Sequence, residues 1–339
     1  MDKYSLRVRT MQRLGNVLEN EGDYRAAQTA LERALANART DAHRASILND
    51  MGWVMMQRSQ PVEAQKLIEQ ALQICETKLT HDAVHEAMRA QILDHLGAIY
   101  KYNGDLLQAL DIHQRSLKIK TALGDTFGMA ESENNVGMTW RTKGNLQEAA
   151  RRFEHSLKLL QQVDYPLGIA NGLMNIGTVL DDEGKLPQAI EQYHLAQQAF
   201  ERIGHRHGSA LCLDNLATCY DKLGEYARAL NYLNSALTIY SELGDLEGEA
   251  HARIGRSQTL LALNQREAAL VEANAALKLA ESTRSVEQIA DARGTLARAL
   301  RANGDREGAV EQFREAISLY QNIGNLTEVA TLQAELEME

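Results

Sequence analysis

The sequence predicts an all-α protein built as a solenoid, which is a linear stack of antiparallel helix pairs. Small residues recur at three fixed places in the pattern, mostly at intervals of forty residues. Glycine followed by a polar residue interrupts the helical pattern on the same interval, and only three prolines occur in 339 residues. A fixed period of this size is typical of repeat architectures, in which each repeat buries its apolar face against its neighbours.

The recurring small residues predict where helices approach closely, since close packing of two helices requires short side chains. The first small position is occupied by Gly15, Gly52, Gly97, Gly137, Gly177, Ala217, Ser257 and Ala297. The second lies twelve residues later and is occupied by Ala27, Ala64, Ala109, Ala149, Ala189, Ala229, Ala269 and Ala309. The third lies seven residues after the second and is occupied by Ala34, Ala71, Ser116, Ser156, Ala196, Ala236, Ala276 and Ala316.

The segments between the predicted helices have the composition of helix ends. Glycine can adopt the left-handed conformation that ends a helix, and a following Asn or Asp can cap the next helix, as in Gly144-Asn145. Two units lack this glycine: Ser59-Gln60-Pro61 places proline in a first helical turn, and Asn264 is the next best left-handed residue. The glycine recurs at Gly22, Gly104, Gly184, Gly224 and Gly304.

We therefore predict one continuous domain over residues 1–339, with eight helix-turn-helix units and a C-terminal capping helix. The cap is expected at 325–339, because an uncovered solenoid end would expose apolar surface. The eight units are expected at about 5–39, 42–79, 83–123, 126–163, 166–203, 206–243, 246–282 and 286–323.

Composition narrows the classes of function. A formal net charge of −10 argues against binding to nucleic acid or to an anionic membrane, and favours partners of basic or neutral character. No apolar run approaches the roughly 18 residues that a membrane span needs. The three cysteines, Cys75, Cys212 and Cys219, have no metal-type spacing and are expected to be buried in a reducing compartment. We therefore expect a cytoplasmic protein.

The residue patterns of common catalytic sites are missing from the sequence. The glycines serve repeat packing and turns, so that no phosphate-binding loop remains. His81 and His85 stand four residues apart, but no third metal ligand has a predictable place beside them. The adjacent acids Asp181 and Asp182 fall at a helix end, where they serve solubility rather than acid–base chemistry. We expect a protein that is not an enzyme and that needs no cofactor or metal.

The spacing of small residues resembles the tetratricopeptide repeat, which places small residues at its eighth, twentieth and twenty-seventh positions. All eight units match over residues 5–322. The variant with Leu-Gly-Asp between units, as at 123–125 and 243–245, is similar to the repeats of kinesin light chains and spindle-orientation adaptors. It is also similar to the sensor arrays of bacterial signalling ATPases and transcription regulators. The resemblance implies a right-handed α-solenoid whose first helices line a concave groove.

The same resemblance implies which residues face the groove. Its sixth position carries Asn135, Asn175 and Asn215 at forty-residue intervals. An asparagine side chain offers a donor and an acceptor, and can pair with the backbone of an extended peptide. Alternatively, these asparagines bond a neighbouring helix and set the pitch of the solenoid. The groove is expected to be amide-rich and mildly acidic; its further candidates are Asn134, Asn171, Thr178, Asp181, Asp182, Asp214, Thr218 and Asp221, with Arg141 and Lys222 as cations.

Two candidates lie nearer the start of the chain. His95 occupies the sixth position of the third unit. Trp53 in the second unit is a candidate apolar anchor, with packing against the neighbouring repeat as the alternative. The fifth position carries no lysine in any unit, which argues against the grip on a C-terminal carboxylate that co-chaperones of this fold use.

Two functions follow from this groove. The leading hypothesis is a protein-interaction scaffold that binds an extended peptide or partner segment. The alternative is a ligand-sensing regulatory array of a signalling or transcription-control system, which transmits a change of curvature to an effector. Self-association through the apolar ends of the solenoid is a further possibility.

Overall fold

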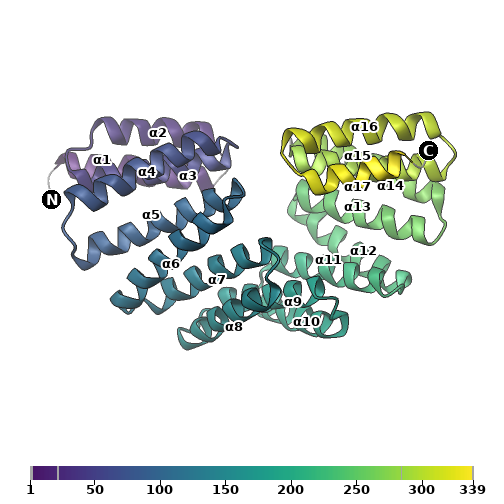
Figure 1. Ribbon diagram of the computed structural model, residues 1–339, viewed down its shortest axis with the longest axis horizontal. Helices are drawn as coiled ribbons and strands as arrows, with labels where there is room; N and C mark the ends of the chain where they lie inside the picture. The colour runs from purple at the N-terminus through teal and green to yellow at the C-terminus, as the bar shows by residue number, and fades with distance from the viewer. Residues whose placement is uncertain (1–2, 21–22, 284, 338–339) are drawn as a thin grey trace. The chain divides into compact units, whose positions relative to one another are not determined.

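The computed structural model describes residues 3–20, 23–283 and 285–337, which form seventeen α-helices and no strand. Consecutive helices pack as eight antiparallel pairs, followed by one single helix (Figure 1). The predicted all-α repeat fold is therefore confirmed. The predicted helix stop at Gly22 and the last two residues of the predicted cap, 338–339, lie outside the described residues.

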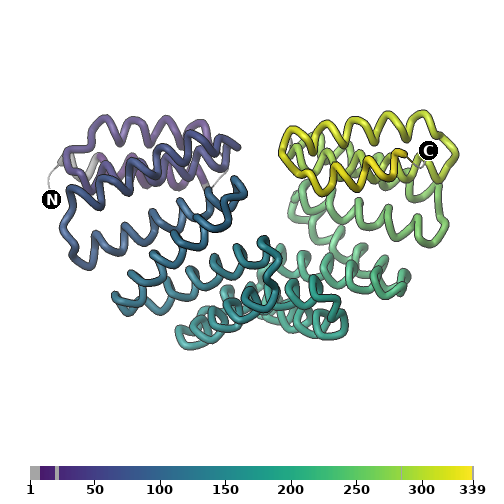
Figure 2. The backbone as a smooth tube through the Cα atoms, viewed as in Figure 1, coloured from purple at the N-terminus to yellow at the C-terminus, as the bar shows by residue number. Residues whose placement is uncertain are grey.

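The chain divides into two compact units, and the first extends to Tyr165. Each of its helix pairs packs on the next pair, and the backbone of this unit runs from purple to teal in Figure 2. Its helices are α1 (Lys3–Asn20), α2 (Tyr24–Ala36), α3 (Asp41–Gln57), α4 (Pro61–Lys78), α5 (Ala83–Tyr102), α6 (Leu106–Leu123), α7 (Thr126–Thr142) and α8 (Leu146–Gln162).

The second unit begins at Pro166 and is built in the same way. Its helices are α9 (Pro166–Asp182), α10 (Leu186–Arg202), α11 (Arg206–Lys222), α12 (Tyr226–Leu243), α13 (Leu246–Ala262), α14 (Arg266–Thr283), α15 (Val286–Ala302), α16 (Arg306–Asn322) and α17 (Leu326–Leu336). The single helix α17 packs on α16, and its Val329 and Leu332 are buried with Phe313 and Tyr320. It therefore covers the apolar face of the last pair.

The glycines at the first small position are sites where one helix of a pair lies directly on a side chain of the other. A Cβ atom at Gly52 would come within 2.4 Å of Ile68, and one at Gly137 within 2.8 Å of Phe153. Gly15, Gly97 and Gly177 lie in the same way against the side chain sixteen residues later. The sequence pattern is thus explained by packing, because any larger side chain would force the two helices apart.

The turns between helices adopt the predicted backbone conformation. Gly144 has a φ of 82° in the turn between α7 and α8. Where glycine is missing, Ser59, Asp164 and Asn264 take the left-handed conformation, with φ values of 57°, 48° and 58°. The sequence predicts the left-handed conformation at Asn264 only. At Ser59 the sequence pattern assigns the turn to the following proline instead.

Cys75, Cys212 and Cys219 are free and buried, as expected. Burial raises the pKa of the thiol to about 11 at Cys75 and about 12 at Cys212 and Cys219. A neutral thiol behaves as a small apolar group, so that these cysteines belong to the packing of the helices. Across the described residues, no helix combines the length and the apolar character that crossing a membrane requires.

Candidate functional site

The predicted groove residues divide between the two units. Five of them lie in the first unit and nine in the second, always on the first helix of a pair. Those of the first unit are Trp53 on α3, His95 on α5, and Asn134, Asn135 and Arg141 on α7. Those of the second are Asn171, Asn175, Thr178, Asp181 and Asp182 on α9, and Asp214, Asn215, Thr218 and Asp221 on α11.

In the first unit, Trp53 and His95 stack on each other and link α3 to α5. Their ring centroids are 4.6 Å apart and the ring planes differ by 19°. Nδ1 of His95 lies 2.9 Å from Oδ1 of Asn49, also on α3. Burial lowers the pKa of His95 to about 4, so that the imidazole is neutral near pH 7. In this arrangement Trp53 packs against the neighbouring repeat.

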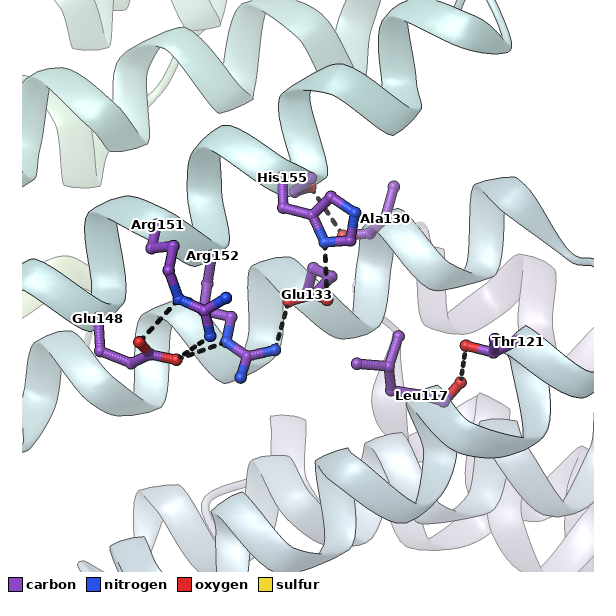
Figure 3. A network of polar contacts seen from close by, with 9 residues as sticks. Leu117, Thr121, Ala130, Glu133, Glu148, Arg151, Arg152 and His155 are labelled. Atoms are coloured by element: carbon purple, nitrogen blue, oxygen red, sulfur yellow. Dashed lines mark hydrogen bonds and ion pairs between the residues drawn. The ribbon is translucent and has the colours of Figure 1, made fainter.

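A buried carboxylate beside the asparagines of α7 fastens this helix to α8 (Figure 3). Glu133 is only 4% exposed. Its Oε2 accepts a hydrogen bond of 2.9 Å from Nη1 of Arg152, and its Oε1 lies 2.9 Å from Nδ1 of His155. Arg151 and Arg152 both donate to Glu148, and the bonds from Arg151 do most to lower the pKa of Glu148 to about 2. The network holds the adjacent polar face of α7 in place.

The asparagines at the sixth position differ in their surroundings. All three are half-buried. Within the described residues, the side-chain amides of Asn135 and Asn215 have no hydrogen-bond partner, whereas Asn175 takes part in an interaction. Thr178 accepts a hydrogen bond of 3.3 Å from the hydroxyl of Tyr193, which ties α9 to α10. Two of the three asparagines thus present unsatisfied donors and acceptors.

An ion pair between Asp181 and Lys222 links α9 to α11. Nζ of Lys222 lies 2.7 Å from Oδ1 of Asp181. Asp182, Asn171 and Thr218 are exposed at the surface. The charge of Asp181 is therefore neutralised by Lys222.

A pocket of about 300 Å³ opens where α11, the end of α12 and the start of α13 meet. Asp214 and Asn215 contribute to it from the predicted set. Asp214 is only 4% exposed, and its Oδ2 accepts a hydrogen bond of 2.9 Å from the hydroxyl of Tyr240. The full lining is His207, Leu211, Asp214, Asn215, Tyr240, Asp245, Glu247, Gly248 and His251.

The rim and floor of this pocket are held by specific contacts. Asp245 caps α13 through a 2.9 Å bond from the backbone N–H of Gly248, and its other oxygen lies 2.9 Å from Nδ1 of His207. His251 is exposed at the rim, with Nδ1 3.5 Å from Oδ2 of Asp214. Hydrogen bonding to Asp214 raises the pKa of His251, while burial and the nearby Asp214 raise that of Tyr240. Tyr240 is thus a neutral donor to a carboxylate.

Sequence reasoning missed Tyr240, His207, Asp245 and His251. One signal was present: Lys120, Phe200, Tyr240 and Tyr320 recur at multiples of forty residues. Gly208 and Gly248 lie against Phe200 and Tyr240, where an added Cβ atom would come within 2.4 Å of the ring. A side chain at this position of a second helix therefore reaches the first helix of the next pair.

Eight helix pairs with small residues at their contacts define a helical repeat protein. Family models described as tetratricopeptide repeat match residues 7–77, 88–162 and 168–242, and residues 289–323. Because these matches cover more than half of the chain, it belongs to the tetratricopeptide repeat (TPR) family. No curated protein matches the chain.

Several solved structures share this fold. A signal transduction ATPase with numerous domains (STAND) that carries a TPR sensor, from Pyrococcus horikoshii, is 16% identical with a TM-score of 0.67; the match covers 95% of this chain and 49% of that one. The apo quorum sensor NprR from B. thuringiensis is 14% identical with a TM-score of 0.67; the match covers 94% of this chain and 88% of that one. A Rap protein complexed with competence and sporulation factor is 12% identical with a TM-score of 0.63; the match covers 98% of this chain and 97% of that one.

Proposed function

We propose that the chain is a non-catalytic protein-interaction module that holds an extended segment of a partner protein along the first helices of its repeats. The observation that carries this proposal is the pair of half-buried, unpartnered amides of Asn135 and Asn215 among the described residues. Each offers one donor group and one acceptor group, which match the backbone C=O and N–H of an extended peptide.

The charge of the second unit supports a partner segment of basic or neutral character. Asp182, Asp214 and Asp221 lie on α9 and α11. The two cations of these helices are engaged by acids of the chain, Lys222 by Asp181 and Arg206 by Glu242. An exposed ion pair contributes only about 0.2 to 1 kcal/mol. Charge therefore selects among partners, while backbone bonding supplies a binding mode that does not depend on sequence.

A regulatory role is the second candidate. The proteins of the same fold include the quorum sensor NprR and a STAND protein with a TPR sensor. The Rap protein was solved in complex with competence and sporulation factor, which supports a ligand-responsive version of the module. Small-angle X-ray scattering with and without a selected peptide tests this candidate, and an unchanged scattering curve on saturation would favour the passive scaffold.

A random dodecapeptide library displayed on phage tests the interaction module directly. We expect selection against the wild-type chain to enrich peptides that bind with measurable affinity. The Asn135→Ala and Asn215→Ala double variant should bind these peptides about thirtyfold more weakly, because each of the two asparagines loses a hydrogen bond worth about 1 kcal/mol. Fluorescence anisotropy with purified peptides measures the change.

The matched control is the double variant Asn231→Ala and Asn234→Ala, which removes two exposed asparagines from the second helix α12. It should bind the selected peptides as the wild type does. Circular dichroism establishes that both variants are folded. A library that yields no binders, or peptides that bind the Asn135 and Asn215 variant at full strength, would refute the proposal.

A further inference from the structure

The pocket between α11 and α13 contains a buried carboxylate that the chain satisfies on one oxygen only. Oδ2 of Asp214 receives the hydroxyl of Tyr240 and lies 3.5 Å from His251. Oδ1 of Asp214 is buried and has no hydrogen-bond partner among the described residues. Leaving a buried charged acceptor unpaired costs several kcal/mol. A ligand that donates a hydrogen bond to this oxygen would remove that cost.

The same repeat position in the first unit shows how the chain satisfies such a carboxylate by itself. Asp94 precedes Asp214 by 120 residues, which is three repeats, and is also largely buried. Nζ of Lys120 lies 2.6 Å from Oδ2 of Asp94, and Oγ of Ser132 donates to Oδ1 at 3.3 Å. Nδ1 of His113 lies 3.7 Å from the same Oδ1. Both oxygens of Asp94 therefore have neighbours that the chain provides.

Three substitutions between these equivalent positions account for the orphan oxygen. The residues 120 positions after Lys120, Ser132 and His113 are Tyr240, Ala252 and Leu233. Tyr240 keeps one hydrogen bond but removes the cation, while Ala252 and Leu233 carry no polar group. The second unit thus retains the buried acid and lacks the buried lysine and the donor to its second oxygen.

We propose that the pocket binds the cationic side chain of an arginine or lysine carried by the partner segment, with Oδ1 of Asp214 as its acceptor. This assignment rests on the proposed function and names the chemistry that one subsite recognises. A volume of about 300 Å³ lies at the small end of the range for ligand pockets, which suits one side chain rather than a folded element. Arginine and lysine are donors only, so they cannot present a lone pair to the carboxylate.

The charges around the pocket favour a cation over a neutral donor. Asp245 and Glu247 line it together with Asp214, and Asp291 on α15 lies near enough to influence His251. His207 is engaged by Asp245. His251 carries a positive charge only when protonated, and no Lys or Arg lines the pocket. Charge-assisted hydrogen bonds are about twice as strong as neutral ones, and a buried acceptor strengthens them further.

The test uses two soluble probes that differ in charge and hardly in shape. Nα-acetyl-arginine methylamide is titrated into the ¹⁵N-labelled full chain, and Nα-acetyl-citrulline methylamide serves as the neutral counterpart. We expect the arginine probe to shift the backbone amide signals of Gly248 and His251 and to saturate, with the citrulline probe at least tenfold weaker. Asp214→Asn should weaken arginine binding at least tenfold, because it keeps the shape and removes the charge.

The control is Asp111→Asn, which removes an exposed acid from α6 in the first unit and should leave arginine binding unchanged. Equal binding of citrulline would show that the pocket takes a neutral donor and would overturn the proposal. The proposal would also be overturned if the arginine probe shifted other amide signals but not those of Gly248 and His251. Full-strength arginine binding by a folded Asp214→Asn variant would overturn it as well. If Asp214→Asn fails to fold, the comparison of the arginine and citrulline probes on the wild-type chain still tests the proposal.

The two proposals fail in different ways. Library peptides that bind the chain while the arginine probe does not would leave the interaction module intact and remove the cation pocket. An arginine probe that binds while no library peptide does would show a cation site without the wider binding face.

Discussion

Single histidines illustrate how neighbouring groups decide the charge of a side chain. Burial lowers the pKa of His95 to about 4, whereas hydrogen bonding to Asp214 raises the pKa of His251 above its ordinary value. Near neutral pH, His95 is therefore a neutral stacking partner of Trp53. His251 instead becomes a cation more readily than a free histidine, on the very carboxylate that is proposed to bind arginine.

The titration of His251 is predicted to depend on Asp214. Its folded pKa should lie above about 6.5, the usual histidine value, and should fall in the Asp214→Asn variant. Because the folded pKa is the higher one, the stabilisation is complete below about pH 6.5 and is lost as the pH rises through the folded value. Side-chain NMR titration measures the pKa of His251 in the wild type and in the Asp214→Asn variant. A pKa unchanged by the substitution would contradict the prediction.

Arginine binding should also weaken as the pH falls through the pKa of His251. The protonated ring is a cation within 3.5 Å of Asp214, so it competes with the ligand for the same charge. The other acids near His251 are Asp245 and Glu247, which line the pocket, and Asp291 on α15. Replacing His251 with Gln should flatten this dependence in the same NMR titration.

At the level of the helix, close contacts are made at particular glycines rather than along whole faces. Gly248 and Gly255 both lie on α13, seven residues apart. A Cβ atom at Gly248 would approach the ring of Tyr240 to 2.4 Å, while one at Gly255 would meet Leu233 at 3.4 Å. The first distance is a clash and the second is an ordinary contact.

The two glycine-to-alanine variants of α13 should therefore have opposite effects on stability. Gly248→Ala is expected to destabilise the chain by about 1 to 3 kcal/mol, as overpacked sites generally do. Gly255→Ala is expected to be neutral or to stabilise by up to about 1 kcal/mol, because alanine favours the helix. Urea unfolding followed by circular dichroism measures both, and a destabilising Gly255→Ala with a neutral Gly248→Ala would contradict the packing assignment.

The helices could be predicted from the sequence because the residues that define them lie close together in the chain. The glycines at 15, 52, 97, 137 and 177 recur at the repeat interval, and each lies on a side chain sixteen residues later. The pocket could not be predicted in the same way. Its donor Tyr240 lies 26 residues from Asp214, and which oxygen it reaches depends on the direction of both side chains. The positive φ of Ser59 was missed because serine has little intrinsic preference for that conformation.

At the scale of the whole molecule, the two compact units carry their own buried cores. One apolar cluster extends from Val8 to Ile119 within the first unit. The second unit contains several, including the cluster around Tyr240 and the one around Phe313 beneath α17. Stability in repeat proteins is a sum of local terms of this kind.

The fragments 1–165 and 166–339 are therefore each predicted to fold when expressed alone. Circular dichroism should show helical spectra and cooperative thermal unfolding for both, since each retains its own clusters of buried apolar residues. A disordered fragment would instead favour the single continuous domain that the sequence pattern suggests. Analytical ultracentrifugation of the fragments checks that association does not substitute for folding.

The residue at position 120, 200 or 240 belongs to one helix pair but touches the first helix of the next pair. The glycines that hold a pair together are separate from it, as Gly137 and Phe153 illustrate. After duplication of one repeat, three substitutions, at the positions of Lys120, Ser132 and His113, would turn a carboxylate that the chain satisfies into one with an unpaired oxygen, while the glycine contacts within each pair are kept. Ligand preferences can therefore change in one repeat of such a chain while the packing glycines of the other repeats stay the same.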